Sequence, residues 1–507
     1  MSRLPSPQSL RPFALLAAVP LILWPVVALR DHVFRDELYY IALGQHLDLG
    51  YVDIPMLTAV LAAVSHALFG ESLLGLRLFP ALAGTASIVL TGLMARTMGG
   101  GQGAQFLAAL GALVAPVFLA TNTLFGPDVF DRVVWIAGAF VLTLMLRRDD
   151  PSLWPAFGAI AAVGLLTKLT VVFWGSAVVL GLLLAGRRRL LTDRWVLAGG
   201  AIAVAGLLPY VIWQILHGWP SPEFWSHYGG KLADLSPADF VLQQLLGMNP
   251  FTLPLWGIGL YALLAGRLAR PFRPLGISFL ILFVFFLATR AKSYFLAPAY
   301  PALLAAGAVT LTDVRETMRR FVVVPYAIIL GLSGALMAVV AMPLFPPEVT
   351  ALVMSAMGPQ KVQQERLAVA ELPQYLADRY GWEEMVATVA DVYRGLPSDE
   401  RSRACIFVTN YGRAAAIDFY GPRYGLPKAI SGHNNYYLWG LRGCTGRVVI
   451  TTGNGDRVLS AAFDRIERVA TITCVYCMPY ENHLPVWVAR DPKLPGELLW
   501  PGVKHYD

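Results

Sequence analysis

Apolar runs that suit membrane-spanning helices fill most of residues 1–345 of this 507-residue chain. A helix needs about 20 residues to cross a hydrocarbon layer of ~30 Å. Nine clear runs approach or exceed this length: 12–30, 74–95, 104–122, 129–146, 195–217, 250–266, 274–289, 295–312 and 321–343. A tenth, longer stretch at 155–186 is interrupted by Thr167-Lys168-Leu169-Thr170, which suits two short spans that meet at a polar turn. The sequence therefore predicts about eleven transmembrane helices.

The composition supports this interpretation. Hydrophobic residues make up 56% of the chain and charged residues only 14%, whereas soluble proteins carry about 25% charged residues. The net charge of +7 can indicate nucleic-acid binding, but the arginines lie in short loops between apolar runs rather than on one soluble face. We interpret them as topology signals and expect no nucleic-acid partner.

The distribution of arginines predicts an orientation, because cytoplasmic loops of membrane proteins are rich in Lys and Arg. With the N-terminus inside, the cytoplasmic segments contain Arg3, Arg11, Arg96, Arg147, Arg148, Arg187, Arg188, Arg189, Arg194, Arg267, Arg270, Arg273, Arg315, Arg319 and Arg320. The opposite side is much poorer in charge. An odd number of spans then places the residues after about 345 outside. The first apolar run lacks a small-residue cleavage site, so we expect it to remain as an anchor.

Two of the outer loops are longer than a turn between helices requires. The loop 31–73 contains an amphipathic segment and a short apolar stretch at 56–69, where we expect interfacial helices. The loop 218–248 begins with aromatic residues that suit the membrane surface.

The composition becomes that of a soluble domain near residue 365. We therefore predict a transmembrane domain over 1–345, a linker over 346–364 and an extracytoplasmic α/β domain over 365–507. Its helical patterns cover 365–379 and 382–394, and its strand-like runs cover 406–409, 448–452 and 485–488. The sequence Asn410-Tyr411-Gly412-Arg413 follows the first of these strands. It suits a strand-to-helix turn, and it can also present backbone N–H groups to an anion.

The cysteines agree with an external position for this domain. All four, Cys405, Cys444, Cys474 and Cys477, lie in the last hundred or so residues, where an oxidising compartment would permit disulfides. The Cys474/Cys477 pair has the spacing of a zinc ribbon, but the second pair that such a site needs is missing.

Acidic residues at the outer ends of the predicted helices require an explanation, because a charge at mid-membrane costs roughly 2.5–3.5 kcal/mol. Asp36 and Glu37 follow the first helix, Asp53 precedes Pro55 in the same loop, and Asp128 begins the fourth helix. For Asp128 alone, a favourable interaction with the helix dipole is a sufficient explanation.

Cations on the same side of the membrane change this assessment. Six of them break the charge rule there: Arg35, Arg77, Lys168, Lys231, Arg290 and Lys292. Cations beside carboxylates are what a phospho-sugar lipid requires, because cations stabilise a phosphate leaving group while a carboxylate accepts a proton from the acceptor. The lipid tail would remain in the membrane while its head group reacts at the surface.

Several motifs resemble those of the protein O-mannosyltransferase and aminoarabinose transferase group, which are type C glycosyltransferases. These motifs are Asp36-Glu37-Leu-Tyr39-Tyr40, Gly50-Tyr51-Val-Asp53-Ile-Pro55-Met-Leu57, Phe125-Gly-Pro-Asp128, Leu166-Thr-Lys168 and Lys292-Ser-Tyr294-Phe-Leu-Ala-Pro298-Ala-Tyr300-Pro301. They occur in order over residues 12–312. In addition, Asn410-Tyr-Gly and His433-Asn434-Asn435-Tyr436 are similar to segments of bacterial members of the group.

The resemblance implies roles for the acidic residues. Asp36 matches the catalytic acid of the first outer loop, the general base, with Glu37 as the reserve candidate. Asp128 matches a second acidic position that orients the acceptor or the base. Asp53 matches a position that binds the donor or a metal, although Ile54 stands where the group has a basic residue or histidine, and the second proline is missing.

The same resemblance implies a phosphate site. Lys168, Lys292 and Tyr294 match positions around the lipid phosphate, and Arg290 is a further candidate; an ordinary interfacial anchor is the alternative for the lysines. Arg77 can serve the phosphate or pair with a loop carboxylate. A divalent metal is possible, with Asp53 and His217 as weak candidate ligands. No nucleotide is expected, because no phosphate-binding glycine motif is present.

The resemblance implies transfer of a sugar, with inversion, from a polyprenyl phosphate to a lipid such as lipid A, another glycolipid or a protein, at the outer face of a bacterial inner membrane. A transporter of a lipid-linked or anionic substrate is the main alternative. Another alternative is a sensor or assembly protein whose bundle only anchors the outer domain.

Overall fold

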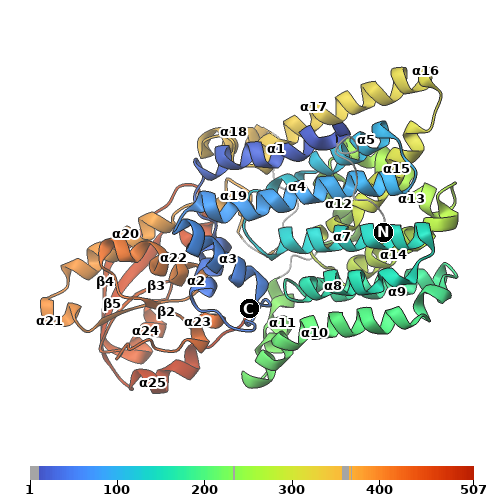
Figure 1. Cartoon of the computed structure of the whole chain (residues 1–507). Helices are drawn as coiled ribbons and strands as arrows, with labels where there is room; N and C mark the ends of the chain where they lie inside the picture. The colour runs from blue at the N-terminus through green and yellow to red at the C-terminus, as the bar shows by residue number, and fades with distance from the viewer. Residues whose placement is uncertain (1–10, 232–234, 357–364, 367) are drawn as a thin grey trace.

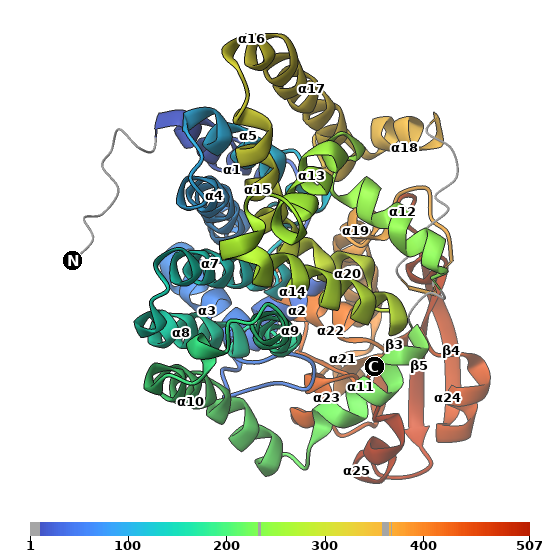
Figure 2. The ribbon, with the colours of Figure 1, turned by 90° about the vertical axis from the view of Figure 1, so that its right-hand side faces the viewer.

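The computed structural model describes residues 11–231, 235–356, 365–366 and 368–507, which form a helical bundle with a smaller α/β domain at one end (Figure 1). Many bundle helices run roughly parallel, and Figure 2 views several of them end on. Arg3 and part of the predicted linker 346–364 lie outside the described residues, as do the side chains of Arg11 and Lys231.

The bundle contains most of the apolar helices. Their bounds are α1 (Arg11–Ala28), α4 (Leu73–Thr97), α5 (Gln102–Leu113), α6 (Pro116–Thr121), α7 (Pro127–Arg148), α8 (Trp154–Leu165), α9 (Thr170–Leu184), α10 (Arg194–Leu216), α13 (Leu253–Leu264), α14 (Ala269–Ala288), α15 (Tyr300–Thr312) and α17 (Val324–Ala341). A 3-10 segment, η5 (Ser293–Ala299), precedes α15, and α18 (Pro347–Ala356) follows α17. The prediction of a polytopic helical membrane protein is confirmed.

Six helical segments within the described residues are long and apolar enough to cross a membrane. They are Leu73–Thr97, Pro127–Arg148, Arg194–Leu216, Ala269–Ala288, Ser293–Thr312 and Arg319–Ala341. Five more are apolar but shorter: Phe13–Ala28, Leu57–Phe69, Pro151–Leu165, Thr170–Leu184 and Pro250–Leu264. The count of about eleven spans stays a prediction.

Breaks in the helices follow local chemistry. The stretch 155–186 divides into α8 and α9 around Thr167–Leu169, as the sequence predicts. The stretch 104–122 was expected as one helix but forms α5 and α6, because Pro116 has no N–H to continue the helical hydrogen bonds and begins a new helix instead.

Burial distinguishes central from peripheral helices. In the most apolar 18-residue window of α7, 67% of the residues are buried, whereas the values are 11% in α10 and 22% in the Arg319–Ala341 segment. The last two segments therefore present apolar side chains outward, as lipid-facing helices must.

Each long outer loop forms two helices. The first contains α2 (Arg35–Gln45) and α3 (Leu57–Phe69), and the second contains α11 (Pro220–Lys231) and α12 (Pro237–Gly247). Helix α3 exposes Leu68 and Phe69, which agrees with an interfacial position. Helix α2 differs from that expectation, since most of its side chains are buried between the bundle and the α/β domain (Figure 1).

The α/β domain is built on a mixed five-stranded sheet with the order β2-β1-β3-β5-β4. The strands are β1 (Ala404–Val408), β2 (Ala429–Ile430), β3 (Val448–Thr452), β4 (Phe463–Ile472) and β5 (Leu484–Pro492). Strands β2, β1 and β3 are parallel, and β5 pairs antiparallel with β3 and with β4. Helices α20 (Trp382–Gly395) and α22 (Tyr411–Tyr420) pack on the sheet.

One prediction for this domain was wrong in detail, and one strand was missed. In the described residues of 365–379, the predicted helix is limited to α19 (Gln374–Ala377), because Pro373 fixes the start of that short helix. Strand β4 was not anticipated, because its sequence carries charges on most of its exposed edge positions, as edge strands commonly do.

One apolar core joins the first outer loop to the α/β domain. Leu38, Leu43 and Ile54 from the loop belong to the same cluster as Ile406 and Ile450 from the sheet, and all five are buried. The two parts are therefore packed together as a unit.

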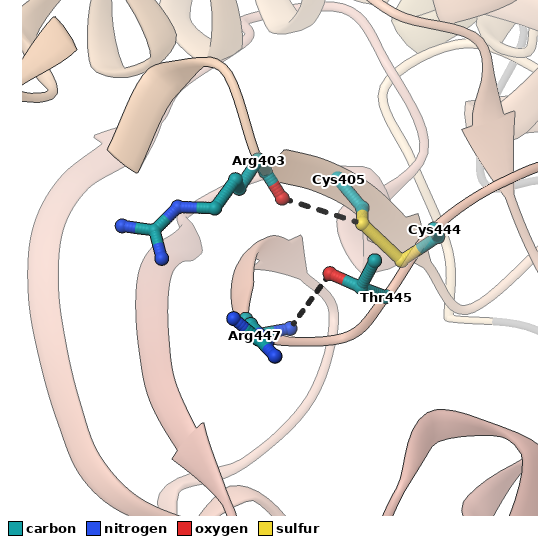
Figure 3. Close-up of a disulfide and its surroundings, with 5 residues drawn as sticks. All are labelled: Arg403, Cys405, Cys444, Thr445 and Arg447. Atoms are coloured by element: carbon teal, nitrogen blue, oxygen red, sulfur yellow. Dashed lines mark hydrogen bonds between the residues drawn. A yellow bond between two sulfur atoms is a disulfide. The ribbon is translucent and has the colours of Figure 1, made fainter. Parts of the chain in front are cut away.

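Two of the cysteines form a disulfide within the domain. Cys405 on β1 is bonded to Cys444 in the loop before β3 (Figure 3). Cys474 and Cys477 are free thiols. With two of the four sulfurs in a disulfide, a four-cysteine zinc site is excluded.

Candidate active site

Glu37, the reserve candidate for the base, lies fully buried at the start of α2. Its carboxylate accepts hydrogen bonds from the backbone N–H groups of Phe34 (2.9 Å) and Phe125 (2.8 Å). Arg77 donates to both of its oxygens, from Nε at 2.9 Å and from Nη2 at 2.7 Å. Both carboxylate oxygens are therefore occupied by donors. Through these bonds Glu37 links α2 to α4 and to the start of α7.

Arg77 completes a buried charge network. It donates from Nη1 to Asp31 Oδ2 (2.5 Å) and from Nη2 to the carbonyl of His32 (2.9 Å), and Asp31 also pairs with Arg379 of the α/β domain. Of the two roles considered for Arg77, pairing with loop carboxylates is the one that this geometry favours.

Asp36, the leading candidate for the base, is the next residue along the same helix, and its side chain is 29% exposed. Its Oδ1 accepts hydrogen bonds from Arg35 Nε (3.1 Å) and from the hydroxyl of Tyr411 (2.8 Å). Its Oδ2 accepts no hydrogen bond from the residues that the structure describes. One oxygen is therefore held while the other can take part in proton transfer.

Asp53 lies close to Asp36 across the first outer loop. The hydroxyl of Tyr39 donates to Asp53 Oδ1 (3.0 Å). Burial raises the pKa of Asp53 to about 7, and the nearby charge of Asp36 acts in the same direction.

Tyr40 shows that the acidic candidates converge. Burial raises the pKa of its phenol well above the usual value. Three neighbouring carboxylates add to this shift, those of Asp36, Asp53 and Asp128. Candidates that are up to 92 residues apart in sequence, from Asp36 to Asp128, therefore lie near enough to one phenol for their charges to act on it.

Asp128 is paired with the first predicted phosphate ligand. Its Oδ1 accepts a hydrogen bond from Lys168 Nζ. Lys168 lies in the turn between α8 and α9, and its ammonium is 4.5 Å from the ring centroid of Phe295. The turn that interrupts the long apolar stretch therefore places Lys168 beside the carboxylate of Asp128 at the start of α7.

Lys292 lies near the same aromatic ring, that of Tyr294. The Tyr294 ring centroid is 5.8 Å from Lys168 Nζ and 5.9 Å from Lys292 Nζ. Lys292 donates to Glu365 Oε1 at 2.6 Å. Burial alone would raise the pKa of Glu365, but Lys292 and Arg35 lower it to about 2.

The two remaining candidates are both exposed. Arg290 is in the turn after α14, two residues before Lys292, with a backbone φ of 52°. His217 caps the end of α10; its Nδ1 lies 2.9 Å from the carbonyl of Trp213, on whose ring it also stacks. In the described part of the chain, the three-residue group with metal-ligand geometry is His433, His505 and Asp507, and it includes neither His217 nor Asp53.

Sequence reasoning missed several residues of this cluster. Tyr411 belongs to a turn whose sequence indicates a role only for its backbone, and Glu365 carries no signal because it stands alone in a polar stretch. Asp378 also escaped notice, although its Oδ2 lies 3.2 Å from Arg35 Nη1. Tyr40 could have been found from the sequence, because it is the last residue of the Asp-Glu-Leu-Tyr-Tyr motif.

Comparisons with known proteins agree with the resemblance seen in the motifs. A family model described as dolichyl-phosphate-mannose-protein mannosyltransferase matches residues 53–213. The structure of ArnT from Cupriavidus metallidurans bound to undecaprenyl phosphate superposes with a TM-score of 0.62 at 15% identity, over 94% of this chain and 98% of that chain. This chain has the type C glycosyltransferase fold.

A second structure of the same relative gives the same result. ArnT in the apo state superposes with a TM-score of 0.61 at 17% identity, over 94% of this chain and 97% of that chain. A search of curated protein sequences finds no significant match. The family model and the fold together support a membrane glycosyltransferase, which is the enzyme class that the motifs predict.

Proposed function

We propose that the protein transfers a sugar from a polyprenyl-phosphate donor to a hydroxyl or phosphate of an acceptor at the membrane surface. The observation that carries this proposal is that carboxylates and cations gather in one place. Asp36 is bonded to Tyr411, whose ring lies 4.6 Å from that of Tyr39, the donor to Asp53. Asp128 is paired with Lys168, and the ammonium groups of Lys168 and Lys292 lie 5.8 Å and 5.9 Å from the Tyr294 ring centroid. A carboxylate that can accept a proton and cations that can hold a phosphate thus lie in one site.

The reaction is a single displacement. The acceptor oxygen attacks the anomeric carbon, its proton passes to Asp36 Oδ2, and the bond between that carbon and the phosphate oxygen breaks. The electron pair leaves with the polyprenyl phosphate, so the configuration of the sugar inverts. Lys168 and Lys292 stabilise the negative charge of the leaving phosphate, and Asp128, bonded to Lys168, orients the acceptor.

A lipid-linked donor suits the position of the site. The carboxylates lie on α2, in the loop after α2 and at the start of α7, at the end of the bundle that faces the α/β domain (Figure 1). A polyprenyl tail can remain in the lipid beside the bundle while its phosphate reaches the lysines. The solved complex of ArnT with undecaprenyl phosphate supports this donor class.

The acceptor is a lipid, such as lipid A or another glycolipid, or a protein hydroxyl. The α/β domain lies outside the cytoplasm, at the outer face of a bacterial inner membrane. This orientation is supported by the turns that follow α7 and α9, which carry arginines and lie at the end of the bundle away from the α/β domain (Figure 1).

The test of function measures sugar transfer in membranes supplied with radiolabelled polyprenyl-phosphate sugars, with and without a chelator. We expect transfer by the wild type, and a loss of about 100-fold or more in Asp36→Asn with donor binding retained. Asp464→Asn, which changes an exposed carboxyl on strand β4, is the control at matched expression. Equal transfer by Asp36→Asn would reject Asp36 as the base, and no transfer by the wild type from any donor would favour a transporter.

A further inference from the structure

The turn Asn410-Tyr411-Gly412-Arg413 is rigidly built. Asn410 caps α22, because its Oδ1 accepts a hydrogen bond from the N–H of Arg413 (2.8 Å), and its Nδ2 donates to Glu481 Oε1 (3.0 Å). Arg413 Nε donates to the other oxygen of Glu481 (2.7 Å). The first turn of α22 is therefore fixed to the segment that precedes β5, and the position of Tyr411 is fixed with it.

A histidine holds Tyr411 from the other side. The backbone N–H of Tyr411 donates to His433 Nδ1 (3.3 Å), and His433 Nε2 lies 2.9 Å from the carbonyl and 3.1 Å from the carboxylate of Asp507. This arrangement needs the proton on Nε2, so that nitrogen is not available to a metal. In this arrangement His433 links the start of α22 to Asp507 and supports Tyr411.

Gly412 allows Arg35 to approach the turn. A side-chain carbon on Gly412 would lie 2.6 Å from Arg35 Cγ, so any larger residue would displace Arg35. The guanidinium of Arg35 is 5.7 Å from the ring centroid of Tyr411, and its Nη1 donates to the hydroxyl of Tyr480 at 2.7 Å. Both groups that hold Asp36 Oδ1, namely Arg35 and Tyr411, are therefore positioned by the α/β domain.

The α/β domain also contacts the part of the first outer loop that contains Asp53. Asn435 Oδ1 accepts a hydrogen bond from the N–H of Val52 (2.8 Å) and lies 3.3 Å from the hydroxyl of Tyr39. Tyr39 is the donor to Asp53. The α/β domain therefore contacts the first outer loop around two of its acidic candidates, Asp36 and Asp53.

We propose that the α/β domain completes the active site, with Tyr411 as a positioning residue that fixes Asp36 Oδ1 and leaves Oδ2 for the acceptor proton. This inference rests on the proposed function of Asp36 as the base. The domain is then required for the chemical step and not only for choosing the acceptor.

The test compares Tyr411→Phe with the wild type in the sugar-transfer assay. Removing the hydroxyl should lower kcat about tenfold to a hundredfold, the expected effect of losing a hydrogen bond to a charged group, and should leave the donor KM within about twofold. Tyr393→Phe is the matched control, because it removes a phenol hydroxyl from α20 that has no hydrogen bond in the described structure. That control should behave as the wild type.

The pH profile separates positioning from a purely structural effect. Without a hydrogen bond to its charged form, the Asp36 carboxylate is less favoured, so the acidic limb of kcat/KM should move to higher pH in Tyr411→Phe. Among the residues that the structure describes, the titratable groups that interact electrostatically with Asp36 are Arg35, Tyr40, Asp53, Asp378 and Tyr411. An unmoved limb together with unchanged kcat would overturn the inference.

A second variant keeps the test valid if Tyr411→Phe accumulates poorly. Gly412→Ala retains the tyrosine but pushes Arg35 away from Asp36, and we expect the same loss of kcat with unchanged donor KM. If both variants match the wild type while Asp36→Asn is inactive, the inference fails and the proposed function stands. If Asp36→Asn transfers sugar normally, the proposed function fails first.

Discussion

At the scale of single residues, Asp36 and Glu37 show how two adjacent acids acquire different roles. Neighbouring residues on a helix project about 100° apart, so Glu37 faces Arg77 inside the protein while Asp36 faces Tyr411 of the α/β domain. Both oxygens of Glu37 are used by protein donors, whereas Asp36 keeps one oxygen that no described residue binds. The accessible carboxylate is therefore the better candidate for proton transfer.

Glu365 provides a prediction about donor affinity. It occupies the position beside Lys292 that a donor phosphate would take in the proposed reaction. In Glu365→Gln the phosphate no longer competes with a carboxylate for the ammonium, so the donor KM should fall about threefold to tenfold. The measurement is the donor KM in the sugar-transfer assay.

Glu371→Gln is the control for this prediction, because it changes an exposed acid in the same stretch of the chain. Its donor KM should match that of the wild type. A donor KM that rises in Glu365→Gln would mean that Glu365 supports Lys292 and does not compete with the phosphate.

Asp53 gives a prediction about pH. Its pKa is about 7 in the folded protein and near 4 in an unfolded chain, so the folded state holds the proton more tightly. Its stabilising contribution is then complete below about pH 4 and is lost as the pH rises to about 7. The melting temperature of the wild type minus that of Asp53→Asn should therefore fall between about pH 4 and about pH 7.

The difference between the two proteins is needed because His433 acts in the opposite direction. Burial lowers the pKa of its imidazole, so its contribution is present at high pH and lost as the pH falls. Both proteins contain His433, and its effect cancels in the difference. A difference that grows with pH would contradict the assignment for Asp53.

At the scale of elements, glycines set the distance between α13 and α15. A side-chain carbon on Gly259 would lie 1.9 Å from the carbonyl oxygen of Leu303, and one on Gly307 would lie 1.8 Å from that of Leu255. The two backbones are therefore in direct contact, as small residues permit between helices in membranes.

Gly259→Ala should separate these helices and lower the melting temperature in detergent, with an overpacking cost of about 1–3 kcal/mol. Gly257, two residues earlier on the same helix, has open space around it. Gly257→Ala should therefore leave the melting temperature unchanged or raise it slightly. Equal effects of the two substitutions would show that the contact with α15 does not limit stability.

The elements also show what the sequence can predict. Apolar length and the polar turn at Lys168 predicted the division into α8 and α9, because both signals are local. The break at Pro116 was missed, since the apolar run continues through it. Strand β4 was missed because its alternation is hidden by charges, and α2 was assigned to the membrane surface because its covering partner lies more than 300 residues away in sequence.

At the scale of the whole molecule, separation in sequence explains which part of the site could be predicted. Motifs within residues 36–294 supplied the carboxylates and lysines, since each stands at the end of a recognisable apolar run. Tyr411 is 375 residues from Asp36, and nothing local indicates that the two meet. Contacts that depend on the docking of one domain on another require the fold.

That docking leads to a prediction about the intact protein. The shared apolar core and the ion pairs of Asp31 with Arg379 and of Arg35 with Asp378 should hold the α/β domain on the bundle without a covalent link. If a protease site is inserted after Phe345 and cut in the purified protein, the two fragments should migrate together in size-exclusion chromatography.

The Trp439→Ala variant loses the stacking contact with His46. After cutting at the same site, its two fragments should separate at a lower denaturant concentration than those of the wild type. Separation of the wild-type fragments on cutting alone would mean that the domain docks only transiently, and the continuous presence of Tyr411 beside Asp36 would then be rejected as well.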